Sequence, residues 1–257
     1  MSNNRRVLLL CSQLLLTLAA RAAGSKTGSI SRAPPPPSPF GKQNPWNNTA
    51  MEYRALGRSG LRVSALSYGA WLTFTEDGQV GVNKAKQILK ECIRQGINFF
   101  DNAESYGSFH GESEIIMGEA LKQIFEEGRS SRSSSSSDTP SANAKAKDVD
   151  VVNIRREELV ISTKLFNARG DGVNNKGLSR KHLIEGMRGS LQRLQLDYVD
   201  LVYAHRFDPT TPLEETVRAF NFLIDQGMAL YWGTSEWTAE EIRRAHQVAE
   251  KLNSKAL

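Results

Sequence analysis

"YVDLVYAH", residues 198–205, is the stretch that most directly decides the fold. Its apolar residues form a nearly continuous run, with Val199, Leu201 and Val202 close together, and do not follow the strict alternation of a half-exposed strand. A helical stripe of apolar residues precedes this run and another follows it. Continuous apolar strands between amphipathic helices are typical of a parallel sheet that is covered by helices. We therefore expect residues 198–205 to form a buried parallel strand.

The same alternation of strand-like runs and amphipathic helices extends along the chain from residue 60 onward. Four further strands are expected: "VSALSYGA" (63–70), "INFFDNA" (97–103), "LVISTKL" (159–165) and "ALYWGTS" (229–235). Between and after the strands, apolar residues recur at the three- and four-residue spacing of helices. The stretch "EYRALGRSGLRVSAL" predicts a hairpin before the first strand, with its turn at residues 58–60. Both a barrel and a doubly wound sheet fit this pattern.

Single residues mark the expected helix ends. Gly96 and Gly227 each fall between a helix and the next strand, where glycine can adopt the left-handed conformation that ends a helix. Ser179 and Thr238 precede two of the helices, and their hydroxyl groups suit the N-cap position. These residues therefore support the boundaries that the periodicity predicts.

Three segments have compositions that are unlike the rest of the chain. Residues 1–24 contain "RRVLLLCSQLLLTLAARAAG", which fits a secretory signal, an organelle transit peptide or a stretch wrongly joined to the gene. Residues 25–50 are rich in proline and predict an extended linker. Residues 127–150 are rich in serine and predict a disordered insertion. The remaining sequence, residues 51–257, is expected to form the main domain.

The charge and the cysteines exclude several classes of function for this domain. Residues 1–51 hold six basic and no acidic residues, so the net charge of +5 comes from this segment and not from the domain. A role in nucleic-acid binding therefore has no support from the domain's charge. The two cysteines are Cys11 and Cys92, which leaves the domain with one thiol and fits a reducing compartment. We find no phosphate-binding glycine motif after the first strand and no cluster of metal ligands in the sequence.

Polar residues stand at the carboxyl ends of the predicted strands. "FFDNAESYGS", residues 99–108, ends one strand with Asp101 and continues to Tyr106. Lys164 and His205 end the next two strands. The carboxyl ends of parallel strands meet at one rim, where active sites of such proteins lie. We therefore expect a carboxylate, a phenol, an ammonium group and an imidazole to gather at one place.

These four groups suit the reduction of a carbonyl compound. A lysine ammonium close to a tyrosine stabilises the phenolate, so the phenol becomes a better proton donor. A carboxylate fixes the position of the lysine, and a histidine can hydrogen-bond a carbonyl oxygen or pass on its proton. Hydride has to come from a nicotinamide cofactor, because side chains cannot supply it.

Long motifs in this sequence resemble those of a known family. They are "YRALGRSGLRVSALSYGAW", "GINFFDNAESYG", "GLSRKHLIEGMRGSLQRLQLDYVDLVYAHRFDPTTPLEETVRAF" and "QGMALYWGTSEW". The chain resembles the aldo-keto reductases, and most closely the branch similar to the beta subunits of voltage-gated potassium channels. The resemblance runs from about residue 52 to residue 253 and is interrupted by the serine-rich insertion. It implies an α/β fold of the (β/α)₈ TIM barrel type and the NADPH-dependent reduction of aldehydes and ketones.

The resemblance also implies roles for single residues. Tyr106 is the general acid of a catalytic tetrad, Lys164 modulates it, Asp101 pairs with Lys164, and His205 is the fourth member. The residues implied to contact NADP(H) are Trp71, Gln79, Asp101 and Ser235. Channel beta subunits of animals tend to have asparagine where His205 stands, so the resemblance favours catalysis over channel regulation.

About five βα units are visible in the sequence, whereas a complete barrel has eight of each element. The sequence therefore predicts an incomplete barrel and a chain truncated at its carboxyl end. Three hypotheses follow: an NADPH-dependent reductase of small carbonyl compounds, a regulatory beta-like subunit of a membrane potassium channel, or an inactive truncated product. The family implies a cytoplasmic location and suggests a homo-oligomer, while residues 1–24 suggest secretion or targeting to an organelle.

Overall fold

A computed structural model describes residues 49–75, 80–134, 151–167 and 170–252 of the chain. The predicted leader and the predicted linker up to residue 48 lie outside the described residues. Gln79 and residues 135–150 of the predicted insertion also lie outside them. The predictions for these segments therefore remain predictions.

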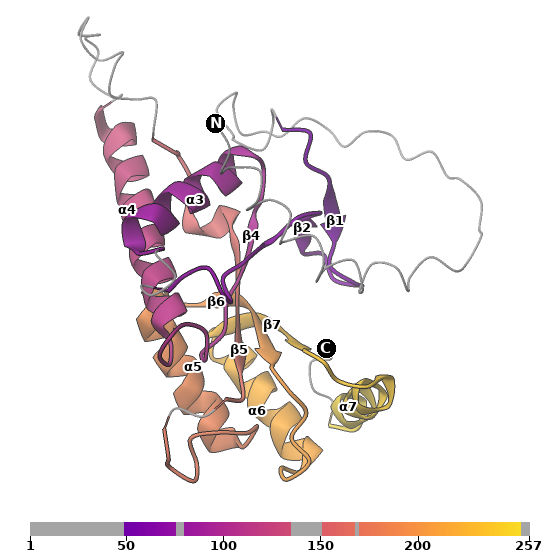
Figure 1. Cartoon of the computed structure of the whole chain (residues 1–257). Helices are drawn as coiled ribbons and strands as arrows, with labels where there is room; N and C mark the ends of the chain where they lie inside the picture. The colour runs from indigo at the N-terminus through magenta and orange to yellow at the C-terminus, as the bar shows by residue number, and fades with distance from the viewer. Residues whose placement is uncertain (1–48, 76–79, 135–150, 168–169, 253–257) are drawn as a thin grey trace, which may run out of the picture. The chain divides into compact units, whose positions relative to one another are not determined.

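Five parallel strands form the main sheet (Figure 1). They are β3 (Tyr68–Gly69), β4 (Phe99–Asp101), β5 (Val160–Leu165), β6 (Val199–Ala204) and β7 (Ala229–Thr234). Each strand pairs with the next one along the chain, so the spatial order equals the sequence order. A doubly wound sheet reverses its order at a switch point, whereas a barrel adds its strands in one direction. The order of these strands therefore selects the barrel type and excludes the doubly wound alternative.

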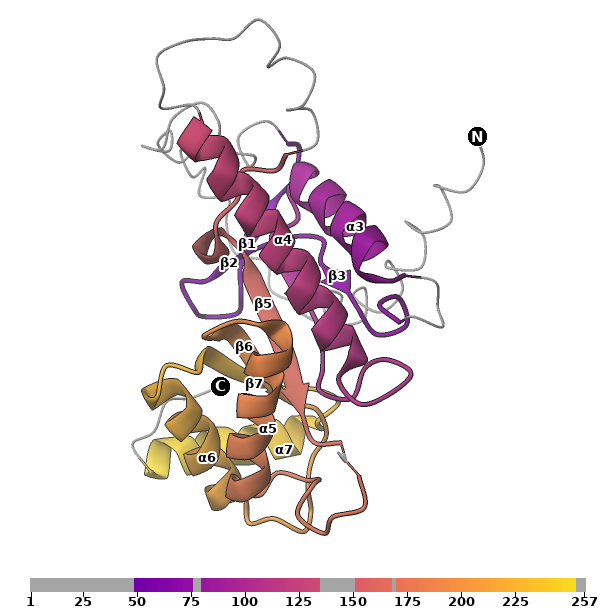
Figure 2. The same ribbon diagram turned by 90° about the vertical axis from the view of Figure 1, so that its left-hand side faces the viewer.

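In the described ranges, one α-helix follows each of these five strands, and each helix packs against the next one (Figure 2). They are α3 (Val82–Arg94), α4 (Glu112–Ser134), α5 (Arg180–Leu194), α6 (Leu213–Asp225) and α7 (Ala239–Lys251). The predicted apolar stripes provide the contact, since residues such as Leu89, Leu121 and Leu183 are fully buried. A short 3-10 helix, Arg156–Glu158, leads into β5. Within the described ranges, no helix has both the length and the apolar character that crossing a membrane requires.

The predicted hairpin is present, but the strand expected at residues 63–70 is divided between two sheets. β1 (Tyr53–Ala55) pairs antiparallel with β2 (Arg62–Ser64), and β3 begins four residues later, at Tyr68. The division occurs at Ser64, which hydrogen-bonds Asn98 twice. The Ser64 backbone N–H donates to the side-chain oxygen of Asn98 at 2.8 Å, and the Ser64 hydroxyl oxygen accepts from the Asn98 backbone N–H at 3.1 Å. The hairpin covers the amino-terminal part of the sheet, where Val63 packs with Val160 and Leu201.

The predicted helix ends are confirmed. The Ser179 hydroxyl accepts a hydrogen bond from the His182 N–H and caps α5. Thr238 caps α7 in a reciprocal capping box with Glu241. Gly96 and Gly227 have φ values of 87° and 68°, in the left-handed region that glycine adopts without strain.

The prediction of disorder from residue 127 is wrong for residues 127–134, because α4 continues to Ser134. Contacts of this last part of the helix explain the difference. Glu127 forms ion pairs with Lys86 and Lys90 of α3, at 3.0 and 2.6 Å. Gly128 is buried against the backbone of residues 152–154. These tertiary contacts stabilise helical turns whose composition alone favours a loop.

Candidate active site

Backbone hydrogen bonds bring the ends of β4, β5, β6 and β7 to one rim. The Asn102 N–H donates to the Ser162 carbonyl oxygen at 3.0 Å, directly after β4. The His205 N–H donates to the Leu165 carbonyl oxygen at 3.1 Å, and the Ser235 N–H donates to the Ala204 carbonyl oxygen at 2.9 Å. Asp101 is the last residue of β4, and Lys164 lies one residue before the end of β5. His205 and Ser235 directly follow β6 and β7.

Lys164 lies at the centre of this rim and is only 8% exposed. Its Nζ donates to Oδ2 of Asp101, to the carbonyl oxygen of Asn102 at 2.8 Å and to the phenolic oxygen of Tyr106 at 3.1 Å. An ammonium group has three donors, so these contacts engage all of them. The positive charge is thereby fixed between a carboxylate and a phenol.

Asp101 is held through both of its carboxylate oxygens. Oδ2 pairs with Lys164, and Oδ1 accepts a hydrogen bond from the Ser162 hydroxyl at 2.6 Å. Ser162 is fully buried and lies two residues before Lys164, on the same face of β5. The sequence analysis missed Ser162, although the two-residue spacing from Lys164 was a usable signal.

Tyr106 lies between two other rings. Its ring centroid is 6.3 Å from that of Trp71 and 5.7 Å from that of His205, which meets it edge to face. The backbone of Tyr106 is fixed as well, because its N–H donates to the Ala103 carbonyl oxygen and its own carbonyl oxygen accepts from the Ser113 N–H. The phenol is therefore held in place, while Trp71 keeps 54% of its surface exposed at the rim.

His205 is a buried, uncharged imidazole. Burial, followed by the positive charges of Lys164 and Arg206, lowers its pKa from 6.5 to about 4. The ring is therefore neutral near neutral pH and carries one proton. Its Nδ1 lies 3.2 Å from the side-chain nitrogen of Asn167, a residue that the sequence analysis did not single out.

The structure describes three of the four predicted cofactor residues, Trp71, Asp101 and Ser235. Trp71 and Asp101 lie at the rim, as described above. Ser235 follows β7, and within the described chain its hydroxyl has no hydrogen-bond partner. The next residue, Glu236, pairs with Arg206 at 3.3 Å and leaves the Ser235 hydroxyl free. An unengaged hydroxyl and an exposed indole beside the phenol fit the amide and the ring of a nicotinamide.

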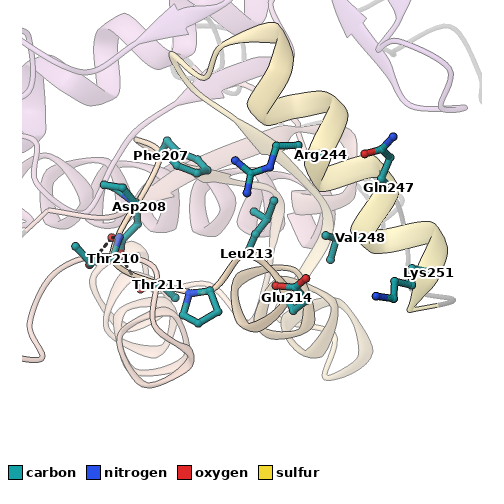
Figure 3. Close-up of a pocket in the computed structure, with 12 residues that line it drawn as sticks. Phe207, Asp208, Thr210, Thr211, Leu213, Glu214, Arg244, Gln247, Val248 and Lys251 are labelled. Carbon is teal, nitrogen blue, oxygen red and sulfur yellow. Dashed lines mark hydrogen bonds between the residues drawn. The ribbon is translucent and has the colours of Figure 1, made fainter.

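A separate cavity of about 670 Å³ lies between the loop after β6 and helix α7 (Figure 3). Arg244 and Lys251 of α7 line it, together with Glu214 and Asp208. The Asp208 carboxylate already accepts hydrogen bonds from Thr210, Thr211 and Leu178. Burial would raise the pKa of Asp208, but these hydrogen bonds together lower it to about 2. The cavity contains none of the predicted site residues, so the rim and not the cavity is the candidate active site.

The comparison with family models gives one match that covers most of the domain. Residues 65–255 match the model described as "Aldo/keto reductase family". The chain belongs to the aldo/keto reductase family. The sequential parallel sheet with its helices agrees with an incomplete α/β barrel of this family.

Two curated relatives of this chain carry the same name. A protein of Oryza sativa subsp. japonica named "Probable voltage-gated potassium channel subunit beta" is 51% identical over 203 residues. A protein of Arabidopsis thaliana with this name is 47% identical over 203 residues. Each alignment covers 79% of this chain and 52% of the relative. The chain therefore spans about half the length of the curated relatives it matches, and the predicted resemblance to the channel beta-subunit branch is confirmed.

Proposed function

We propose that this protein is an NADPH-dependent reductase that converts aldehydes or ketones to alcohols, with Tyr106 as the general acid. The observation that carries this proposal is the contact set of Lys164. One ammonium group donates both to the Asp101 carboxylate and to the Tyr106 phenolic oxygen, and little of it is exposed to water. This arrangement matches what a phenol needs in order to give up its proton near neutral pH.

When bound, NADPH would supply the hydride that reaches the carbonyl carbon. Tyr106 would deliver its proton to the carbonyl oxygen during this step. The phenolate that remains would lie 3.1 Å from the Lys164 ammonium, which stabilises its negative charge. Asp101 would keep Lys164 charged and in position, and Ser162 would hold Asp101.

His205 and the neighbouring residues would bind and orient the substrate and the cofactor. A neutral imidazole can hydrogen-bond a carbonyl oxygen without adding a second positive charge beside Lys164. We propose that the Ser235 hydroxyl holds the nicotinamide amide and that Trp71 forms a wall of the site. Asp101 and Gln79 are the other proposed cofactor contacts.

A matched pair of tyrosine variants tests this function. The full chain is incubated with NADPH and a small aromatic aldehyde, and the consumption of NADPH is followed. Tyr106→Phe is expected to lower turnover at least about a hundredfold, since it removes the acid and keeps the ring. Tyr198→Phe is the control, because its ring stacks under Arg156 and lies outside the rim contacts. Equal turnover by Tyr106→Phe and the wild type would refute the role of Tyr106.

A second candidate function is the regulation of a membrane potassium channel. The observation in its favour is the name of the two relatives, which describes them as probable channel beta subunits. For this candidate function, we propose that the chain forms a homo-oligomer and is located in the cytoplasm. Purification from cell membranes would test this candidate: a potassium channel that co-purifies with the protein would support it. A reductase with full turnover and no channel partner would exclude it.

A further inference from the structure

Asn167 connects His205 to the loop that carries Tyr106. Asn167 lies two residues after the end of β5, and its side-chain nitrogen donates to the Ser105 hydroxyl oxygen at 3.0 Å. The same nitrogen lies 3.2 Å from Nδ1 of His205. One amide group therefore spans from the residue before Tyr106 to the imidazole beside the Tyr106 ring.

The contact between the Asn167 side-chain nitrogen and Nδ1 of His205 decides which ring nitrogen of His205 carries the proton. A neutral imidazole has one N–H donor and one nitrogen with a lone pair. The Asn167 NH₂ group can only donate, so the His205 nitrogen that faces it has to be the acceptor. The remaining proton then resides on Nε2. Which ring nitrogen is protonated is set in this way by the hydrogen bond that the other nitrogen makes.

The second ring nitrogen has the properties of an unused donor. His205 is 7% exposed, and within the described part of the chain no side chain or backbone group hydrogen-bonds its Nε2. The charged groups that lower the pKa of His205, Lys164 and Arg206, are cations and cannot accept a hydrogen bond from it. An N–H without a protein partner is available to a carbonyl oxygen of a ligand.

We propose that Asn167 is a positioning residue that holds His205 in the tautomer with its proton on Nε2, so that Nε2 can donate to the substrate carbonyl oxygen. The consequence for catalysis rests on the proposed reductase function. The position of the proton does not, because it follows from contacts within this chain. The same contacts join His205 to Ser105, so Asn167 also ties the imidazole to the Tyr106 loop.

Nitrogen NMR of the imidazole rings tests the proposal without any substrate. The full chain is labelled with ¹⁵N in its histidine side chains, and long-range proton–nitrogen correlations are recorded near neutral pH. The spectrum of His205→Gln identifies the signals of His205 among the four histidines. We expect a single tautomer in the wild type, with a protonated Nε2 and an unprotonated Nδ1.

Two substitutions at Asn167 and one control complete the experiment. Asn167→Asp replaces the donor by an acceptor and is expected to move the proton to Nδ1. Asn167→Leu removes the contact and is expected to give a mixture of both tautomers. Asn175→Leu makes the same change in the same loop after β5, away from the contacts of His205, and is expected to keep the wild-type signals.

Two results would overturn the proposal. A proton on Nδ1 in the wild type would mean that the amide is turned, so that its oxygen faces His205. A single Nε2–H tautomer in Asn167→Leu, identical to the wild type, would mean that Asn167 does not determine it. Absence of carbonyl turnover in the wild type would refute the proposed function instead and would leave the tautomer result unchanged.

Discussion

Replacing His205 by glutamine is expected to remove an acid-sensitive contribution to the stability of the fold. The folded protein holds this imidazole with a pKa of about 4, because of burial and of the charges of Lys164 and Arg206. In the unfolded chain the imidazole regains its ordinary pKa of about 6.5. Between these two values the unfolded chain binds more protons than the folded one. The stabilising contribution is therefore complete above pH 6.5 or so and is lost as the pH falls towards 4.

The pKa values set the size of this effect. A difference of one in pKa corresponds to about 1.4 kcal/mol, so the change from 6.5 to about 4 limits the contribution of His205 to about 3 kcal/mol. About 2 kcal/mol of this should be lost between about pH 7.5 and about pH 5, where the unfolded chain alone takes up the proton. The buried Glu114 acts in the opposite direction, because burial raises its pKa, but it contributes equally to the wild type and the variant.

Urea unfolding at these two pH values measures the effect. The free energy of unfolding of the wild type is expected to fall by about 2 kcal/mol more than that of His205→Gln between about pH 7.5 and about pH 5. His246→Gln is the control for the loss of a half-buried imidazole outside the rim. If the free energy of unfolding falls by the same amount in the wild type and in His205→Gln between these two pH values, the surroundings of the imidazole do not keep it uncharged. The description of the site would then be wrong.

Two further predictions concern the central ion pair and the packing of α4 on α5. Lys164→Met should lower the free energy of unfolding by about 3 kcal/mol, because it leaves the Asp101 carboxylate without its cation. Adding Asp101→Asn should recover part of this loss in urea unfolding, and a further decrease would contradict the pairing. Gly118→Ala should cost about 2 kcal/mol or more in thermal unfolding, since its Cβ would lie 2.5 Å from the Arg193 carbonyl oxygen. Gly60→Ala, whose Cβ meets nothing within 4 Å, is the control, and equal melting temperatures would contradict the close packing.

The sequence predicted the strands and helices well where hydrophobic periodicity is strong. The run at 198–205 became β6, and the glycines and hydroxyl residues at the helix ends lie where they were expected. Periodicity failed at Ser64, where a pair of hydrogen bonds with Asn98 divides an apolar run between two sheets. It also failed after residue 126, because Glu127 and its lysine partners come from elements that are distant in sequence. Tertiary contacts of this kind leave no local signal.

The four candidate catalytic residues could be found from sequence because three of them lie at or next to the end of a strand and Tyr106 follows in the loop after β4. The residues that hold them could not be found as easily. Ser162 is one of two hydroxyl residues in β5, and its bond to Asp101 becomes visible only when the register of the strands is known. Asn167 lies in a loop, where no periodicity indicates which way its amide points. The sequence therefore indicated the candidate groups that lie together at the rim, and the structure added the residues that contact them.

Transfer of deuterium from the cofactor tests the central claim most directly. The full chain is incubated with NADPH that carries deuterium at the reactive nicotinamide carbon and with a small aromatic aldehyde, and the alcohol is examined by mass spectrometry. A reductase of the proposed type places one deuterium on the carbinol carbon, and Tyr106→Phe reduces the yield of labelled alcohol at least about a hundredfold. Alcohol without deuterium, or no alcohol from a folded chain that binds NADPH, would contradict the account.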